Sequence, residues 1–218
     1  MLNKIEGNRN VITKKRKVNG NFTKVRASTG LDVYISQGDK SSITVEADEN
    51  LHDIIKTEVR DGKLRIYSEK GFWRAKASKV FVVVKNVEEI KATSGSDVYS
   101  DGVLKVKDIV VSTSSGADMK LELEATSVDA SSSSGSDLKI LGTTDTFYGS
   151  ASSGSSTKAY GLKSKDATVK ASSGADLTIY VTESLDARAS SGGDIRYKGN
   201  PEKINKRRSS GGDIYSRS

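Results

Sequence analysis

The most constraining feature of this chain is a short phrase that returns eight times. Each copy has two small residues, a glycine, one variable position, a polar residue that is aspartate in seven copies, and then, in all but one copy, an apolar residue. The first copy spans residues 28–33 and the last spans 209–214, and from Gly95 onward the glycines lie 18 to 21 residues apart. A fixed period near 20 residues is typical of a solenoid, in which each unit buries its apolar face against its neighbours.

Strand parity divides each repeat into inward and outward positions, because successive side chains of a strand face opposite sides. Two positions are expected to face inward. Three residues after the glycine come Val33, Val98, Met119, Leu138, Thr157, Leu177, Ile195 and Ile214. Five residues after it come Ile35, Ser100, Leu121, Ile140, Ala159, Ile179, Tyr197 and Ser216. A corner strand, a shorter strand and a return strand would fill about 19 residues, which predicts an all-β parallel β-helix.

One outward position is expected to form a vertical column of carboxylates. It holds Asp32, Asp97, Asp118, Asp137, Ser156, Asp176, Asp194 and Asp213. Coils stack at roughly 4.8 Å, and at that spacing two carboxylates repel by about 3–4 kcal/mol at an effective dielectric of 20. Lys120, Lys139 and Arg196 lie two positions further along and would offset the repulsion. We interpret the aspartates as a structural ladder.

The chain is expected to form one domain over residues 1–218, with irregular coils over 1–90 and regular coils over 91–218. The 65 residues between Gly30 and Gly95 suggest three coils with insertions. Within them we expect a strand at 43–45, two strands over 58–66 joined at Asp61-Gly62, a buried strand at 80–84 and a helical turn within 48–54. A repeat phrase ends close to the C-terminus, so no cap is expected there. Arg207, Arg208 and Arg217 could discourage edge pairing, or that edge could dock onto another subunit as a homo-oligomer.

Composition excludes several classes of partner. The chain has no cysteine, so disulfides and thiolate metal sites are impossible. The net charge is +7, but the basic runs at 14–17 and 203–208 lack interleaved aromatic residues, and we expect solvated surface rather than nucleic-acid binding. No stretch approaches the roughly 20 apolar residues of a membrane span. The first residues lack the apolar region of a signal peptide, so a leader is expected to be absent from this chain.

Little in the sequence indicates catalysis or a cofactor. The single histidine, His52, is expected in a helical turn or on the surface, and Glu46, Asp48 and Glu49 are expected as surface charge in a turn. Two alternatives remain. One is a polysaccharide-active enzyme, which needs paired carboxylates or an arginine–lysine base in a groove. The other is a calcium-stabilised surface repeat, because the phrase partly resembles the nonapeptide of calcium-binding β-rolls. We predict neither an enzyme nor a metal site.

One segment has the composition of a binding site. Phe72 and Trp73 are adjacent aromatic residues, followed by Arg74, in a basic stretch that is expected to be a loop. Such a loop could stack on a sugar ring or anchor a protein partner, or it could fold back over the open end of the coil. Tyr34 and Tyr99 lie on an outward column, with Tyr215 further along, and could offer further stacking.

Several segments in order carry a family resemblance. They are residues 5–11, 22–27 followed by 32–38, 61–66, the serine-glycine coils, and 197–201. Over nearly its whole length the chain resembles the putative auto-transporter adhesin, head GIN domain family, common in Bacteroidetes. The resemblance implies a right-handed parallel β-helix, a secreted, periplasmic or surface-exposed protein whose leader is often removed, and no established catalytic residues. We therefore expect a non-enzymatic adhesin-like or scaffold module that contacts glycans or a cell-surface protein, with Ser156 interrupting any continuous row of ligands.

Overall fold

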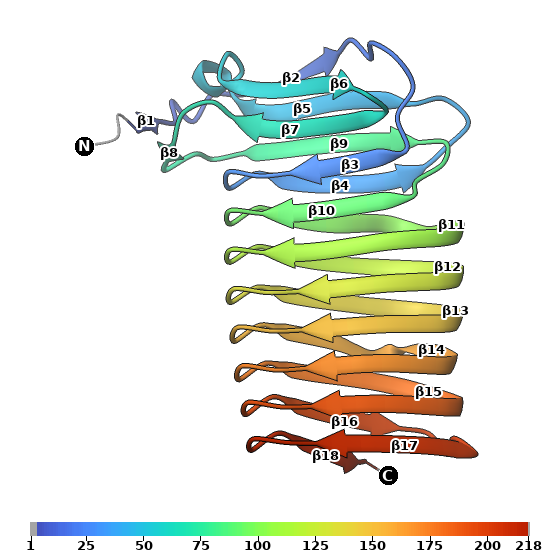
Figure 1. The fold of residues 1–218 in the computed structure, drawn as a ribbon. Helices are drawn as coiled ribbons and strands as arrows, with labels where there is room; N and C mark the ends of the chain where they lie inside the picture. The colour runs from blue at the N-terminus through green and yellow to red at the C-terminus, as the bar shows by residue number, and fades with distance from the viewer. Residues whose placement is uncertain (1–3, 218) are drawn as a thin grey trace.

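The regular part of the molecule is a stack of parallel coils (Figure 1). The computed structural model describes residues 4–217. Its regular strands are β10 (Glu89–Thr93), β11 (Asp97–Ser114), β12 (Asp118–Ser132), β13 (Asp137–Ala151), β14 (Ser156–Ala171), β15 (Asp176–Ala189), β16 (Asp194–Lys198), β17 (Lys203–Arg208) and β18 (Asp213–Ser216). Neighbours from β10 to β16 pair in parallel, β17 pairs with β15 and β18 pairs with β16, so like residues of successive repeats lie side by side. The predicted parallel β-helix is confirmed.

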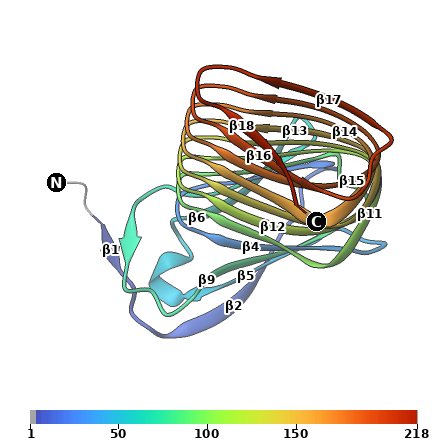
Figure 2. The ribbon, with the colours of Figure 1, turned by 90° about the horizontal axis from the view of Figure 1, so that it is seen from below.

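The prediction of three strands per coil is wrong. Each of β11 to β15 runs as one strand of 14 to 18 residues around nearly a whole coil. Register shifts interrupt some of the ladders within these strands, yet from β11 to β15 only the serine-glycine corner ends a strand. Figure 2, seen along the stack, shows how the strands wrap around a common interior.

The serine-glycine corner is a tight turn of mirror-image type. In one coil Ser153 has φ 54° and Gly154 has φ 67°, and the Ser155 N–H donates to the Ser152 carbonyl at 3.2 Å. Two successive positive φ angles define a type I′ turn, for which glycine is favoured at the second central position. The Gly154 N–H also donates to the Ser173 carbonyl of the next coil at 3.1 Å. The corner therefore continues the coil-to-coil hydrogen bonding.

The core fills the interior along the whole stack, from Phe22 to Ile214. The first inward column is buried throughout, as predicted. The second column is buried except at Ser100, which is half-buried, and Ser216, which is exposed. The variable position after each glycine, which the repeat left free, is also buried, so only small residues or Leu31 occupy it from coil to coil. Two hydroxyl pairs cross this interior, Ser132 Oγ with Thr157 Oγ1 at 2.8 Å and Ser136 Oγ with Thr113 Oγ1 at 3.0 Å.

The first repeat phrase belongs to the coil directly before β11, not to a coil three turns away. Its strands are β3 (Lys24–Ala27), which pairs β10, and β4 (Asp32–Gln37), which pairs β11 with Asp32 opposite Asp97. The 65-residue spacing is therefore one coil with a long insertion. The expectation of three coils is wrong because the insertion packs on the edge of this coil that faces away from β10 and β11. There residues 63–66 pair with β3 and residues 79–84 pair with β4.

The insertion and the first strands build a cap on the stack (Figure 1). Its elements are β1 (Ile5–Glu6), β2 (Val11–Arg16), β5 (Ser42–Asp48), the 3-10 helix η1 (Glu49–Leu51), β6 (Ile55–Arg60), β7 (Lys63–Ser68), β8 (Phe72–Trp73) and β9 (Ser78–Val84). The expected strand at 43–45, the hairpin turning at Asp61-Gly62 and the helical turn are confirmed. Strand β9 is not buried throughout: Val80 and Val82 face the core while Phe81 is 36% exposed.

The expectation that Asp48 is surface charge is wrong, and of the two placements expected for His52 the helical turn is confirmed and the surface is not. Asp48 is completely buried and accepts hydrogen bonds from the backbone N–H groups of Arg9 at 3.0 Å, Lys76 at 3.1 Å and Ala77 at 3.1 Å. His52, directly after η1, is also buried, and its carbonyl accepts from Arg16 Nη2 at 2.8 Å. Buried polar groups keep their partners because an unpaired one costs about 1–3 kcal/mol. These polar groups therefore hold the cap together.

The last coil ends in charged side chains at core positions. Lys206 continues the inward column of Ala187, and Arg208 continues that of Ala189. Lys206 Nζ lies 4.6 Å from the centroid of the Tyr197 ring, and Arg208 Nη1 lies 3.7 Å from Asp213 Oδ1. This end therefore has a covering that the repeat pattern did not predict. No helix among the described residues is long and apolar enough to cross a membrane.

Candidate functional site

The outward face next to the corners carries the aspartate ladder, the column that runs from Asp32 to Asp213. The strand register places its members side by side in successive coils, with Ser156 between Asp137 and Asp176. None of its aspartates is fully buried. The ladder is thus a continuous polar strip along the stack.

A second column, two residues further along each coil, changes character from one end to the other. Near the cap it is aromatic: the Tyr34 ring stacks on Phe81 at 5.2 Å and on Tyr99 at 5.3 Å between centroids. Further along it is mostly basic, with Lys120, Lys139, Lys158 and Arg196, and it also holds Thr178 and, in the last coil, the exposed Tyr215. The tyrosine rings therefore stack on each other. A sugar ring could reach only the edges of these rings and the outer face of the last ring in the stack. Phe81 was missed because an apolar run was interpreted as wholly buried.

The electrostatics of the ladder follow the same change. Near the aromatic end, burial and the carboxylates of Asp118 and Asp32 raise the pKa of Asp97. Burial also raises the pKa of Asp32, against an opposing contribution from Lys79. At the basic end the carboxylates are paired: Lys158 Nζ lies 3.1 Å from Asp137 Oδ1.

Arg196 makes two such pairs, at 2.6 Å to Asp176 and at 3.2 Å to Asp194. The side chains predicted to offset repulsion therefore do so only in part. Of the three predicted side chains only Arg196 forms ion pairs with the ladder, and neither Lys120 nor Lys139 forms one among residues 4–217. Lys158, which was not predicted, pairs with Asp137, whereas Asp97 has no ion pair among the described residues. The ionised carboxylates at the aromatic end of the ladder are therefore less stabilised than those at the basic end.

A hollow of about 300 Å³, here called the Tyr99 groove, opens at the aromatic end of the ladder. Its lining is Tyr34, Tyr99, Ser100, Asp101, Lys120, Leu121, Glu122 and Leu141. It lies where the pairing of β11 with β12 slips between Tyr99 and Val103, and Gly102 has φ 92° in that stretch. Bulges of this kind re-aim side chains and are common next to functional sites. The one sequence signal for it is the 21-residue spacing from Gly95 to Gly116, the longest among the regular repeats.

The predicted Phe72-Trp73-Arg74 loop is a short strand. β8 pairs in parallel with β1, in a two-stranded sheet separate from the coils. Trp73 is 42% exposed, but the Arg74 guanidinium lies 4.4 Å from the centroid of its ring and is held by Glu6 Oε1 at 3.4 Å. One indole face is therefore covered by a cation. Trp73 and the tyrosine column lie on different sheets, so the structure does not assemble the proposed contacts into one site.

The polar groups are not arranged as a metal centre. Among residues 4–217 no group of three or more histidine, aspartate or glutamate side chains is placed to hold a metal ion. His52, the single histidine, has its Nε2 at 3.1 Å from the Ile12 carbonyl and lies inside the cap, away from the ladder. The molecule is thus a parallel β-solenoid with a polar, partly aromatic outer face.

The comparison with known families now identifies the class. The profile of the family described as "Putative auto-transporter adhesin, head GIN domain" matches residues 21–201. The chain belongs to this family, as the sequence resemblance predicted. A search of curated proteins gave no match. Family membership is consistent with a cell-surface or extracytoplasmic binding protein rather than an enzyme.

Solved structures share the fold over the full length. A putative adhesin from Bacteroides fragilis NCTC 9343 aligns with TM-score 0.90 and 21% identity, over 98% of this chain and 100% of the other. A protein named as a putative lipid binding protein, from Parabacteroides distasonis ATCC 8503, gives TM-score 0.79 and 22% identity over 99% and 100%. A putative adhesin from Parabacteroides merdae ATCC 43184 gives TM-score 0.78 and 19% identity over 99% of both chains. At these identities the likeness concerns the fold.

Proposed function

We propose that this protein is a non-enzymatic, extracytoplasmic binding module that holds a carbohydrate unit in the Tyr99 groove. The observation that carries the proposal is the hollow at the slip in β11 pairing, which is lined by Tyr99 together with charged side chains. Its place next to the aspartate ladder gives a long glycan a polar strip to follow. Membership in a family of putative adhesins supports a binding role.

The chemistry of the groove suits a sugar ring better than an apolar ligand. Pyranose rings combine an apolar C–H face with hydroxyls on the rim, and binding sites match this with aromatic walls and a few polar groups. Tyr99 and Leu141 would take the C–H face. Asp101, Glu122 and Lys120 would accept from or donate to the hydroxyls.

The Trp73 strand is retained as a second, weaker contact. With Arg74 over one indole face, only the other face is open to a ligand. A cation stacked on an exposed indole stabilises the pair by about 0.5–1 kcal/mol, so a ligand that displaced Arg74 would first lose that energy. We therefore place the principal contact at Tyr99 and an accessory contact, to a glycan or to a cell-surface protein, at Trp73.

A glycan array tests the proposal with four proteins: wild type, Tyr99→Ala, Trp73→Ala and Tyr148→Ala. Tyr148 is 48% exposed and lies outside the groove, so its variant controls for loss of any surface tyrosine. We expect Tyr99→Ala to lose the bound glycans, Trp73→Ala to weaken them and Tyr148→Ala to bind as wild type. Equal binding by wild type and Tyr99→Ala would exclude the groove, and release of reducing or unsaturated ends from a polysaccharide would replace the proposal with an enzyme.

A further inference from the structure

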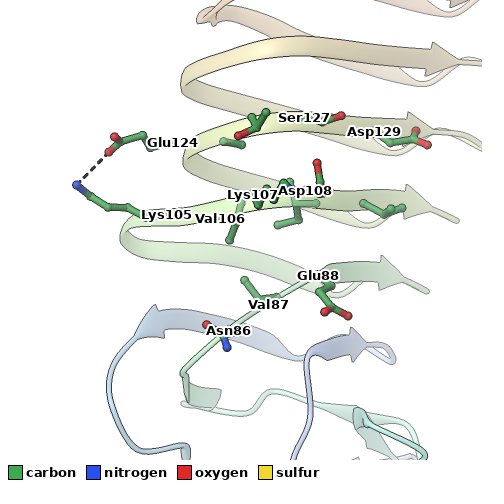
Figure 3. A pocket seen from close by; sticks show the side chains of 14 residues that line it. Asn86, Val87, Glu88, Lys105, Val106, Lys107, Asp108, Glu124, Ser127 and Asp129 are labelled. Carbon is green, nitrogen blue, oxygen red and sulfur yellow. Dashed lines mark ion pairs between the residues drawn. The ribbon is translucent and has the colours of Figure 1, made fainter.

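A larger groove, of about 1020 Å³, lies where the cap meets the first regular coils, and we call it the β11 groove (Figure 3). One wall is the connector at residues 86–88, between β9 and β10. The other wall is formed by β11 at 105–110 and by β12 beyond it. The groove shares no lining residue with the Tyr99 groove, and the inference below is independent of the proposed function.

The groove occupies the place of a missing strand. Strand β11 pairs with β4 over residues 97–100 and with β10 over 110–114. Between these segments, within residues 4–217, its only ladder partner is β12. The coil before β11 leaves the stack after Gln37 and returns at Glu89, because residues 38–88 form the cap. The stretch that would have covered the middle of β11 is therefore displaced into the cap.

The protein covers only the two ends of this open edge. At one end the Gln37 side-chain amide imitates a strand: Nε2 donates to the Lys105 carbonyl at 2.9 Å, and Oε1 accepts from the Lys105 N–H at 2.7 Å. At the other end the Glu88 carbonyl accepts from the Val110 N–H at 2.9 Å. Residues 106–109 lie between them, so the open edge has a defined length and two fixed ends.

The floor of the groove is a core column that the missing strand leaves half covered. Val106 and Ala125 are half-buried and pack against the core. In the same column of the next coils, Thr144, Ser164 and Val181 are buried. The difference identifies the groove as a place where an added apolar side chain would bury apolar surface.

The rim of the groove is acidic on a chain that is basic overall. The carboxylates outnumber the cations, with Glu88, Asp108, Glu124 and Asp129 against Lys105 and Lys107. Lys105 Nζ lies 3.0 Å from Glu124 Oε2, so this pair cancels. The remaining charge is −2, whereas the whole chain carries +7. Complementarity therefore selects a basic occupant.

We propose that the β11 groove binds an extended, basic segment of another polypeptide, which adds a short strand to the open edge of β11. The backbone of residues 106–109 would supply the hydrogen bonds, and an apolar side chain would lie over Val106 and Ala125. Lysine or arginine side chains of the segment would meet Asp108 and Asp129. Addition of a strand to an exposed sheet edge is a common mode of peptide recognition.

Three synthetic heptapeptides test this proposal by isothermal titration calorimetry and hydrogen exchange. The first is acetyl-Ser-Lys-Val-Thr-Val-Lys-Ser-amide, the second replaces both lysines by glutamate, and the third replaces the threonine by proline, which removes a backbone donor. We expect the first to bind at least tenfold more tightly than the other two. We also expect it to slow amide exchange at residues 106–109.

Protein variants separate the groove from other surfaces. Ala125→Trp fills the floor and Asp108→Lys/Asp129→Lys inverts the rim, and each should weaken the first peptide at least tenfold. The double variant changes only exposed side chains, so it keeps the test valid if Ala125→Trp does not fold. Glu183→Lys, an exposed change on β15, should bind as wild type.

Three results would overturn the proposal. The first is a failure of the basic peptide to bind, or equal binding of the glutamate or proline peptide. The second is protection that falls outside residues 106–109. The third is a glycan array whose signals disappear in Ala125→Trp, because that result would assign the groove to carbohydrate.

Discussion

The two ends of the stack cover their exposed core in different ways. At one end a 51-residue insertion, residues 38–88, folds with the first strands into a cap whose interior holds the buried carboxylate of Asp48. At the other end, among residues 4–217, no comparable insertion covers the last coil. Instead, Lys206 and Arg208 replace the alanines of the inward columns and extend over the last core residues.

The two ways of covering the core have different consequences for the rest of the molecule. The cap buries polar groups such as Asp48, which need hydrogen-bond partners from distant segments, and it displaces a strand, which opens the β11 groove. The charged end needs only two substitutions, because long basic side chains cover apolar surface with their stems while their charges stay in water. Inward-pointing charges also prevent a further strand from pairing with the edge. One end thus creates a groove, and the other end covers its core with basic side chains.

The largest expected effect is at the buried carboxylate of the cap. Asp48→Ala leaves three backbone N–H groups without their acceptor, each at a cost of about 1–3 kcal/mol, so we expect a loss of at least about 3 kcal/mol. Chemical denaturation measures the free energy of unfolding. Glu46→Ala, on the same strand and partly exposed, is the matched control and should change it by less than about 1 kcal/mol.

The pH dependence of the same group has a defined sign. Burial acts to raise the pKa of Asp48, and the N–H groups of Lys76, Arg9 and Ala77 outweigh it, so the folded pKa is lowered. The stabilisation is therefore present above the unfolded pKa of about 3.9 and is lost as the pH falls through the lower folded value. A difference between wild type and Asp48→Ala that persisted unchanged to pH 2 would contradict this assignment.

A smaller effect compares the middle of the stack with its charged end. Gly135 and Gly211 both have positive φ, 66° and 75°, and an added Cβ would meet no atom within 4 Å at either. Alanine at each therefore suffers only the backbone penalty, about 1–2 kcal/mol. We expect Gly135→Ala to lower the unfolding free energy by that amount. Gly211→Ala should instead loosen only the last coil, detected as faster amide exchange at residues 213–216 with little change in global stability.

The sequence predicted the repeating part of the fold because each coil repeats one local solution. Val98, Leu138 and Leu177 sit three residues after a glycine, and that spacing alone places them inside. The cap resisted prediction because residues far apart in the sequence determine it. Asp48 binds the backbone of Arg9 and Ala77, which no local pattern connects to it, and its charge alone suggested the surface.

The candidate site was predicted only in part, for a related reason. Strand parity placed Tyr34 and Tyr99 on the outer face. Their rings stack because they lie in adjacent coils, whereas the 65 residues between Gly30 and Gly95 predicted that these coils were far apart. Phe81 joins their column through β9, a strand of the insertion. The Tyr99 groove depends on a slip in strand register. In the sequence this slip appears only as a repeat of 21 residues, from Gly95 to Gly116, in place of the usual 19.

The charged end offers a test of its own. Lys206→Val/Arg208→Ala restores apolar or small side chains to the inward columns and removes the obstacle to edge pairing. We expect the variant to associate with increasing concentration in sedimentation velocity, while wild type keeps one sedimentation coefficient. The exposed charge change Lys203→Ala/Arg207→Ala, on the outward positions of the same strand, removes equal charge and should not cause association. Association of wild type through this end would show that the two basic residues do not block it.

The smallest effect lies in the aspartate ladder, where the aromatic end and the basic end differ. Asp97 has a raised pKa, caused by burial and by the neighbouring carboxylates of Asp118 and Asp32, so the folded state binds its proton more tightly than the unfolded state does. Stability from this group is complete below the unfolded pKa of about 3.9 and is lost as the pH rises through the folded value. Asp97→Asn should therefore stabilise the protein at pH 7, by about 0.5 kcal/mol or less, and the gain should disappear near pH 3.

Asp137 is the matched position at the basic end, because Lys158 pairs with its carboxylate. Asp137→Asn removes an attraction rather than a repulsion, so it should leave stability unchanged or slightly lower at pH 7. Thermal unfolding of both variants at pH 3, 5 and 7 measures the contrast. If both asparagine variants gained the same stability at pH 7, the ladder would have to be uniform along the stack, and the contrast between aromatic and basic ends would have no energetic meaning.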